Sequence, residues 1–272
     1  MTNEERMETA RVDMTQDAYF EASEGRNVVT PENLSGLLEY PALFNAMRSD
    51  RELRPALSPA MSTGRALNDF LTCTAEEFGA RYTVADGPVN PKTGRPYGPE
   101  TKSYLDWASK QDKTPVTSDD FRMFSEMAKA YDGHVVIGNL SAYACHHNAV
   151  YAATVEGVDC LVKIDKLYVS PDAVVAVDIK TTSDIGAFGH TASSLRYREQ
   201  QALIALVLET NGIQNPQVFI AAIEKGPLPR CGVFGVGGLD EIKTALRNDL
   251  HAYGESLVTG GFGTRYESLR ML

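Results

Sequence analysis

The sequence predicts an α/β protein in which a central mixed β-sheet is flanked by helices and preceded by an α-rich N-terminal part. Apolar residues recur at helical spacing over much of 34–132, whereas 149–182 contains short apolar runs typical of strands. The chain then continues with a helix over 194–210, a strand over 217–224 and a final helix over 239–258. With 272 residues, of which 43% are hydrophobic, the chain can bury a sizeable core.

The beginning of the chain divides at about residue 28. Residues 1–28 carry many charges and few large apolar side chains, which indicates a flexible or loosely docked arm. Residues 29–272 are expected to form a single domain. This domain opens with two short helices that meet at Pro41, the first of them capped by Thr30 or Ser35.

A further helix is expected to begin after Ser58 or Ser62 and to carry Asn68. A solvated or capping role is the simplest interpretation of this asparagine. Another helix is expected over 118–132, with carboxylates in its first turn. The stretch 134–158, which contains several β-branched residues, is expected to form strands.

The segment 86–99 is the clearest loop of the sequence, with four prolines and three glycines. Long segments of this kind tend to be functional or mobile. Lys92 and Arg95 lie at its tip and could follow a phosphate backbone. The alternative is an ordinary solvated surface loop.

Composition excludes some functions and leaves others open. The 26 basic and 36 acidic residues give a net charge of −10, which does not identify a nucleic-acid-binding protein. It does not exclude one, because an enzyme that acts on DNA needs positive charge only locally. With no apolar run of 18 residues and no basic-then-apolar leader, we expect a soluble, cytoplasmic protein. The four cysteines form no CxxC pair, which argues against a zinc site or a disulfide framework.

The stretch 161–182 contains the most informative charges. It consists of two apolar runs around a turn near Pro171, and the second run ends in Asp178-Ile179-Lys180. Alternation along a strand places Asp178 and Lys180 on one face, and pairing of the two strands can bring Asp165 beside them. Two carboxylates and an ammonium on a buried sheet are costly unless they bind something. A divalent metal ion together with a phosphate would bind all three.

Hydrolysis of a phosphodiester bond needs groups of this kind. Carboxylates hold Mg²⁺, which neutralises the phosphate and provides hydroxide near neutral pH. A lysine at the edge of the site can orient or deprotonate water, or stabilise developing charge. From the chemistry alone, a metal-dependent nuclease site and a partly solvated ion pair both remain open.

The order of Asp165 and then Asp178-Ile179-Lys180 on the next strand resembles the PD-(D/E)XK nuclease superfamily, whose core is restriction-endonuclease-like, with Ile164-Asp165 in place of its Pro-Asp pair. More narrowly, the chain is similar to the RecE, or exonuclease VIII, branch of phage recombination exonucleases. The similarity runs from about residue 33 to residue 224. It is carried by the segments NLSGLLEYPALF, GRALNDFL, CLVKIDKL, VDIKTTSDIGAF, LRYREQQAL and VFIAAIE.

The resemblance implies a Mg²⁺-dependent exonuclease, with Mn²⁺ as a possible substitute, that digests one strand of linear double-stranded DNA from its 5′ end. It also implies a ring-shaped homo-oligomer, a single-strand annealing protein as partner, and phage-type recombination in the cytoplasm of a bacterial host. Asp165 and Asp178 would be the metal ligands and Lys180 the catalytic lysine. Gln200 would lie near the scissile phosphate, with Tyr197 beside it.

Other positions are less determined by the resemblance. Arg196 and Arg198 could contact phosphates, be solvated or lie at a subunit contact. Family members commonly have a histidine where this chain has Asn68, and a glutamate in the region that reads CHHNAVYAA here. His146 or His147 could replace this acid as a metal ligand, which would favour Mn²⁺. A catalytically weakened relative that binds DNA ends is therefore the alternative to an active enzyme.

Overall fold

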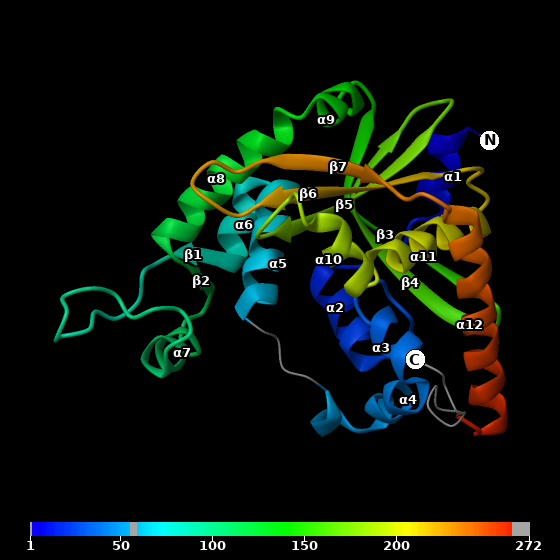
Figure 1. Ribbon diagram of the computed structural model, residues 1–272, viewed down its shortest axis with the longest axis horizontal. Helices are drawn as coiled ribbons and strands as arrows, with labels where there is room; N and C mark the ends of the chain where they lie inside the picture. The colour runs from blue at the N-terminus through cyan, green and yellow to red at the C-terminus, as the bar shows by residue number, and fades with distance from the viewer. Residues whose placement is uncertain (1, 55–58, 263–272) are drawn as a thin grey trace.

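A computed structural model describes residues 2–54 and 59–262. Its centre is a five-stranded sheet in the order β3-β4-β5-β6-β7 (Figure 1). β5 and β6 run parallel, and the other neighbouring strands are antiparallel. The predicted α/β class with a central mixed sheet is confirmed. The strands are β3 (Ala144–Val155), β4 (Val158–Val169), β5 (Val174–Thr182), β6 (Gln217–Glu224) and β7 (Cys231–Gly235).

Helices cover both faces of this sheet, as predicted. One apolar cluster joins the sheet to α11 (Tyr197–Thr210) and α12 (Leu239–Thr259). Every residue of α11 from Gln200 to Leu208 is buried, because the helix lies between the sheet and α12. A second cluster joins the opposite face to α5 (Pro59–Thr72) and α8 (Ser118–Asp132).

The N-terminal segment does not form the loosely docked arm that its composition predicted. It folds into α1 (Asn3–Ala10) and α2 (Gln16–Gly25), and the side chains of Met7 and Tyr19 are fully buried. The backbone N–H of Val12 also donates to Val150 of β3. The few large apolar residues of this segment are enough to dock it because they fall on the inward faces of short helices.

Two further expectations are wrong. The residues Val135–Leu140 form helix α9 rather than a strand, because Ile137 and Leu140 are buried at helical spacing whereas Val135 is exposed. The sequence SDIGAFGHTASS of 183–194 predicts a loop, but its part Phe188–Ser194 forms helix α10, which buries Phe188. Both errors arise from short segments whose packing partners lie elsewhere in the chain.

Two short helices meet at the proline in the N-terminal part, as expected, and the N-cap of the first is Asn33 rather than Thr30 or Ser35. α5 begins at Pro59 in the structure, and Ser58 lies outside the described residues. The remaining elements are α3 (Leu34–Glu39), α4 (Pro41–Ser49), the 3-10 helix η1 (Arg51–Leu53), α6 (Ala75–Arg81), β1 (Tyr82–Val84), α7 (Lys102–Ala108) and β2 (Thr114–Val116).

The loop predicted over 86–99 extends away from the central sheet (Figure 1, teal). It lies between β1 and α7, and β1 pairs in parallel with β2 to form a separate two-stranded sheet. Across the described part of the chain, no helix is both long and apolar enough to cross a membrane.

Candidate active site

The two acidic residues lie where β4 and β5 stop pairing, and both line the same cavity. The antiparallel ladder ends at Lys166 and Val177, and the next pair in this register is Asp165 with Asp178. At this point the N–H of Ile179 donates to Asp165 Oδ2 at 2.9 Å. The carboxylate therefore takes the place of a backbone acceptor, which fixes its position at the end of the ladder.

A local change in β3 and β4 accompanies this arrangement. Up to Ile164, the even-numbered residues of β4 join the cluster beneath α11, whereas from Leu167 onward the odd-numbered residues do so. The switch falls at Asp165. Opposite it on β3, Asn148 has φ of 49°, a left-handed conformation that asparagine adopts more readily than most residues. The strand pair is thus irregular at the residue whose carboxylate enters the site.

Asp178 is held by two donors. Lys180 Nζ lies 2.9 Å from Asp178 Oδ2, and Gln201 Nε2 donates to the same oxygen at 2.7 Å. The Lys180 ammonium also lies 5.0 Å from the centre of the Tyr197 ring. Gln201 is fully buried on α11, so its amide orients the carboxylate from beneath.

Asp165 has a lysine partner of its own. Lys163 Nζ lies 2.8 Å from Asp165 Oδ1 and donates to Asn148 Oδ1 at 3.1 Å. Asn148 in turn donates to Thr72 Oγ1 at 2.9 Å, which connects β3 to the end of α5. The two carboxylates are therefore each paired with a lysine two residues away on the same strand.

Burial and the neighbouring charges shift the pKa values of the two acids in opposite directions. Burial raises the pKa of Asp178 to about 6; the ion pair with Lys180 opposes this shift, and the negative charge of Asp165 adds to it. Burial also acts to raise the pKa of Asp165, but Lys163 and Lys180 together hold it below its usual value. Although burial favours the neutral amine of Lys180, Asp178 raises the pKa of this lysine, so its side chain is protonated at neutral pH.

These groups line a cavity of about 470 Å³. Six of the residues singled out in the sequence lie in its wall, which the strands share with α5 and α11. Gln200 donates through Nε2 to the carbonyl of Leu195 at 3.3 Å, and Asn68 accepts from Thr72 Oγ1 at 3.3 Å. The six residues are Asn68, Asp165, Asp178, Lys180, Tyr197 and Gln200.

Six other candidates lie outside this wall, among them His146, whose Nδ1 lies 3.5 Å from Glu8 Oε1. His147 is exposed, and its Nδ1 lies 2.8 Å from the carbonyl oxygen of Thr72. Arg196 forms an ion pair with Glu199, and Arg198 donates to the carbonyl of Gly237. Lys92 and Arg95 are exposed in the extended loop. The structure therefore does not bring His147 to the carboxylates, and DNA contact by the four basic residues stays a prediction.

Sequence reasoning missed Lys163 and Gln201. Lys163 could have been found, because the alternation that pairs Asp178 with Lys180 also places Lys163 and Asp165 on one face. Gln201 is adjacent to Gln200, and only the orientation of α11 shows that it is Gln201 that reaches Asp178.

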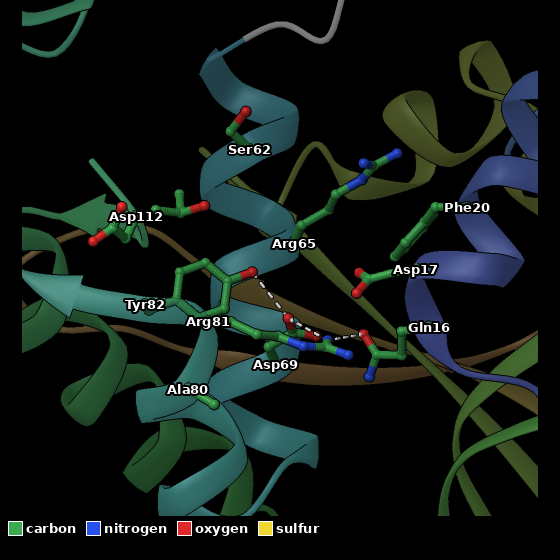
Figure 2. Close-up of a pocket in the computed structure, with 11 residues that line it drawn as sticks. Gln16, Asp17, Phe20, Ser62, Arg65, Asp69, Ala80, Arg81, Tyr82 and Asp112 are labelled. Carbon is green, nitrogen blue, oxygen red and sulfur yellow. Dashed lines mark hydrogen bonds and ion pairs between the residues drawn. The ribbon is translucent and has the colours of Figure 1, made fainter. Parts of the chain in front are cut away.

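A second cavity of about 370 Å³ adjoins the first and shares Phe20, Arg65 and Asp69 with it (Figure 2). The Arg65 guanidinium lies 4.0 Å from the centre of the Phe20 ring. Asp69 pairs with Arg81 at 3.2 Å and accepts from the Tyr82 hydroxyl at 2.9 Å. Asp69 is another acid in the wall of the first cavity, but its carboxylate is engaged by these two side chains.

The residues present fit a magnesium ion held by two carboxylates. In the described residues, no group of three His, Cys, Asp or Glu side chains is arranged to hold a metal. Mg²⁺ is commonly bound through one or two carboxylates, and waters and substrate phosphates complete its shell. The pKa of Asp178 is raised mainly by burial and further by the negative charge of Asp165, and a divalent cation between the two carboxylates would favour their ionised forms. Asp165 and Asp178 would be the ligands.

The metal-free Asp178→Asn variant is expected to be more stable than the wild type at pH 8. Because the pKa of about 6 in the folded protein exceeds the ordinary value of 3.8, protonation of Asp178 stabilises the wild type at low pH, and this contribution is lost as the pH rises through 6. The gain in unfolding free energy of the variant should be on the order of 1–3 kcal/mol at pH 8 and smallest near pH 4.

Urea denaturation in the presence of a chelator, between pH 4 and pH 8, measures this difference. Asp172→Asn is the control, since Asp172 is exposed in the turn between β4 and β5. A variant at Asp178 whose stability follows that of the wild type at every pH would contradict the assignment.

No protein-family model matches the chain, and no curated protein matches it. Among solved structures, the crystal structure of a "putative exonuclease" from Eubacterium rectale is similar over 92% of this chain and 88% of that chain, with a TM-score of 0.59 and 13% identity. The structure of SSO0001 aligns with 48% of this chain and 56% of that chain at 11% identity, and its TM-score of 0.30 is too low to support an argument. At 13% identity the first similarity concerns the fold alone, and it agrees with the mixed α/β architecture of this chain.

Proposed function

We propose that this protein is a Mg²⁺-dependent exodeoxyribonuclease that digests one strand of linear double-stranded DNA in the 5′ to 3′ direction. One observation carries the proposal. Asp165 and Asp178 line one cavity just beyond the last residue pair of the β4–β5 ladder, and the protonated Lys180 lies 2.9 Å from Asp178 in the same cavity. The similarity to an exonuclease-like fold supports this reading of the site.

The residues of this chain have separable roles in such a reaction. Asp165 and Asp178 would hold Mg²⁺, which supplies an activated water and neutralises phosphate charge. Lys180 carries a positive charge and stabilises the negative charge that develops on the phosphate and the leaving oxygen. Gln201 keeps Asp178 in position through the hydrogen bond of 2.7 Å. Lys180 acts as a cation rather than as a base, because its pKa is raised.

The cavity also suits a polyanionic substrate. Although the net charge of the chain is −10, four basic side chains line the cavity, including Arg65 and Lys225. Arg65 forms a long ion pair of 3.4 Å with the exposed Glu24, so a phosphate can compete for its guanidinium. Arg65 and Lys225 are thus suited to contact phosphates next to the one that is cut.

The more specific features of this proposed activity rest on the sequence resemblance to the RecE branch. They are the 5′ to 3′ polarity, the restriction to linear duplexes, the ring-shaped homo-oligomer and the single-strand annealing partner. They also include a role in phage-type homologous recombination, and therefore a place in the bacterial cytoplasm where that DNA lies. Mn²⁺ is expected to substitute for Mg²⁺, since both accept carboxylate and water ligands.

Digestion of linear duplex DNA with Mg²⁺ tests the proposal. The expected result is rapid release of a label from the 5′ ends, slower release from the 3′ ends, and no attack on closed circular DNA. The Asp178→Asn variant serves as the inactive control. Prior release of the 3′ label would contradict the polarity, and equal cutting of closed circles would contradict exonuclease action.

One specific observation favours a second function, a DNA-end-binding protein with weakened catalysis. Two positions near Asp165 carry neutral amides, Asn68 and Asn148, and among the described residues no third acid joins Asp165 and Asp178 in a group that could hold a metal. Such a protein would bind linear ends yet leave them uncut with both Mg²⁺ and Mn²⁺. The same assay, combined with an end-binding measurement, separates the two functions.

A further inference from the structure

Lys163 is an unusual component of this site. Only 8% of this residue is exposed, and its ammonium is bonded to Asp165 Oδ1 at 2.8 Å and to Asn148 Oδ1 at 3.1 Å. The ring of Phe20 on α2 lies 5.9 Å from Nζ. The ammonium is therefore enclosed between β3, β4 and α2, with an anion on one side and an amide oxygen on the other.

The contacts of Asn148 hold this arrangement rigidly. Its side-chain nitrogen donates to Thr72 Oγ1 at 2.9 Å, and this hydroxyl donates to the carbonyl of Asn68 at 2.7 Å. With its nitrogen committed to α5, the oxygen of Asn148 must point toward Lys163. The oxygen of this amide thus accepts a hydrogen bond from Lys163. Because the amide is neutral, it attracts a metal ion less strongly than a carboxylate at the same position would.

Two other acids of the cavity, Asp69 and Glu32, have hydrogen-bonding partners of their own. Asp69 is bonded to Arg81 and Tyr82. Glu32 accepts from the Tyr19 hydroxyl at 2.5 Å. Among the described residues lining this cavity, Asp165 and Asp178 are thus the acids that are bonded to neither an arginine nor a tyrosine.

Nucleases that use two metals place the ions about 3.5–4 Å apart around a shared carboxylate. At Asp165 one oxygen faces Lys163, and the other faces the N–H of Ile179. A fixed ammonium repels a divalent cation on its side of the carboxylate. We propose that the Lys163 ammonium takes the place of a second divalent cation, so that the site binds a single metal ion held by Asp165 and Asp178. This inference rests on the proposed metal-dependent function.

Counting bound Mn²⁺ tests the role of Lys163 without measuring activity. Equilibrium dialysis of the full chain should give about one Mn²⁺ per wild-type chain and about two for Lys163→Gln. Electron paramagnetic resonance should show isolated Mn²⁺ in the wild type and spin-coupled pairs in the variant. Lys163→Arg retains the positive charge and is expected to keep the count at about one.

Lys166→Gln is the matched control. Lys166 is also buried on β4, but its ammonium lies 4.5 Å from the Tyr131 ring, and the residue is not in the cavity wall. Its replacement should leave the Mn²⁺ count unchanged. Lys163→Gln should also melt at a lower temperature than the wild type without metal and gain more stability from Mn²⁺, because Asp165 then lacks a buried counter-charge.

The outcomes distinguish this inference from the proposed function. A wild-type chain with two coupled Mn²⁺ ions would overturn the role of Lys163 while leaving metal-dependent hydrolysis intact, and this measurement does not depend on whether any variant folds. A folded Lys163→Gln variant that still binds one ion would also overturn it. A wild-type chain that binds no Mn²⁺ would contradict the proposed function itself and remove the inference with it.

Discussion

Replacement of Lys180 by methionine is expected to reduce the rate of DNA hydrolysis by about 10²–10³-fold. The Lys180 ammonium is protonated and lies beside Asp178, with 21% of its side chain exposed, so it can stabilise negative charge on the reacting phosphate where water screens it only in part. The methionine side chain fills similar space without the charge. Binding of DNA ends should change little, because other basic side chains line the cavity.

Single-turnover digestion of a 5′-labelled duplex measures the chemical step, and fluorescence anisotropy with the same duplex measures binding. Lys129→Met is a suitable control, because Lys129 is exposed on α8 and pairs with the nearby Glu126. Loss of binding and hydrolysis in equal proportion would assign Lys180 to substrate binding. Full activity of Lys180→Met would exclude it from the reaction.

Replacement of Asp165 by alanine is expected to destabilise the metal-free protein by about 3–5 kcal/mol. This substitution leaves the ammonium of Lys163, whose side chain is only 5% exposed, without its anionic partner. An uncompensated buried charge costs more than the loss of the contact itself. The effect is opposite in sign to that expected for Asp178→Asn, because the two carboxylates have pKa values shifted in opposite directions.

Urea denaturation with a chelator present gives the free energies of unfolding. The Asp165→Ala/Lys163→Met double variant should recover part of the lost stability, since it removes both charges. Asp159→Ala is the control, because Asp159 lies at the exposed start of β4. A double variant no more stable than Asp165→Ala would show that lost packing, rather than the unpaired charge, causes the destabilisation.

The sequence predicted the regular elements well where local signals were strong. The structure has α8 over the residues expected for it, since a capping threonine and first-turn carboxylates determine its start. The strand β6 also has its expected bounds. The prediction failed for α1, α2 and α9, whose composition or β-branched residues argued against ordered helices. In each case a few apolar side chains found partners distant in the chain.

At the site, too, local sequence patterns predicted some contacts, whereas others depend on distant segments of the chain. Alternation along β5 was sufficient to place Asp178 beside Lys180, and the hairpin brought Asp165 near them, because both follow from strand geometry within about twenty residues of chain. The partners of Asp165 could not be read in this way. The left-handed backbone of Asn148, its bond to Lys163 and the choice of Gln201 over Gln200 all depend on how β3, α5 and α11 meet the hairpin. Strand alternation sets which residues share a face, whereas contacts between distant segments determine which of those residues can bind a metal ion.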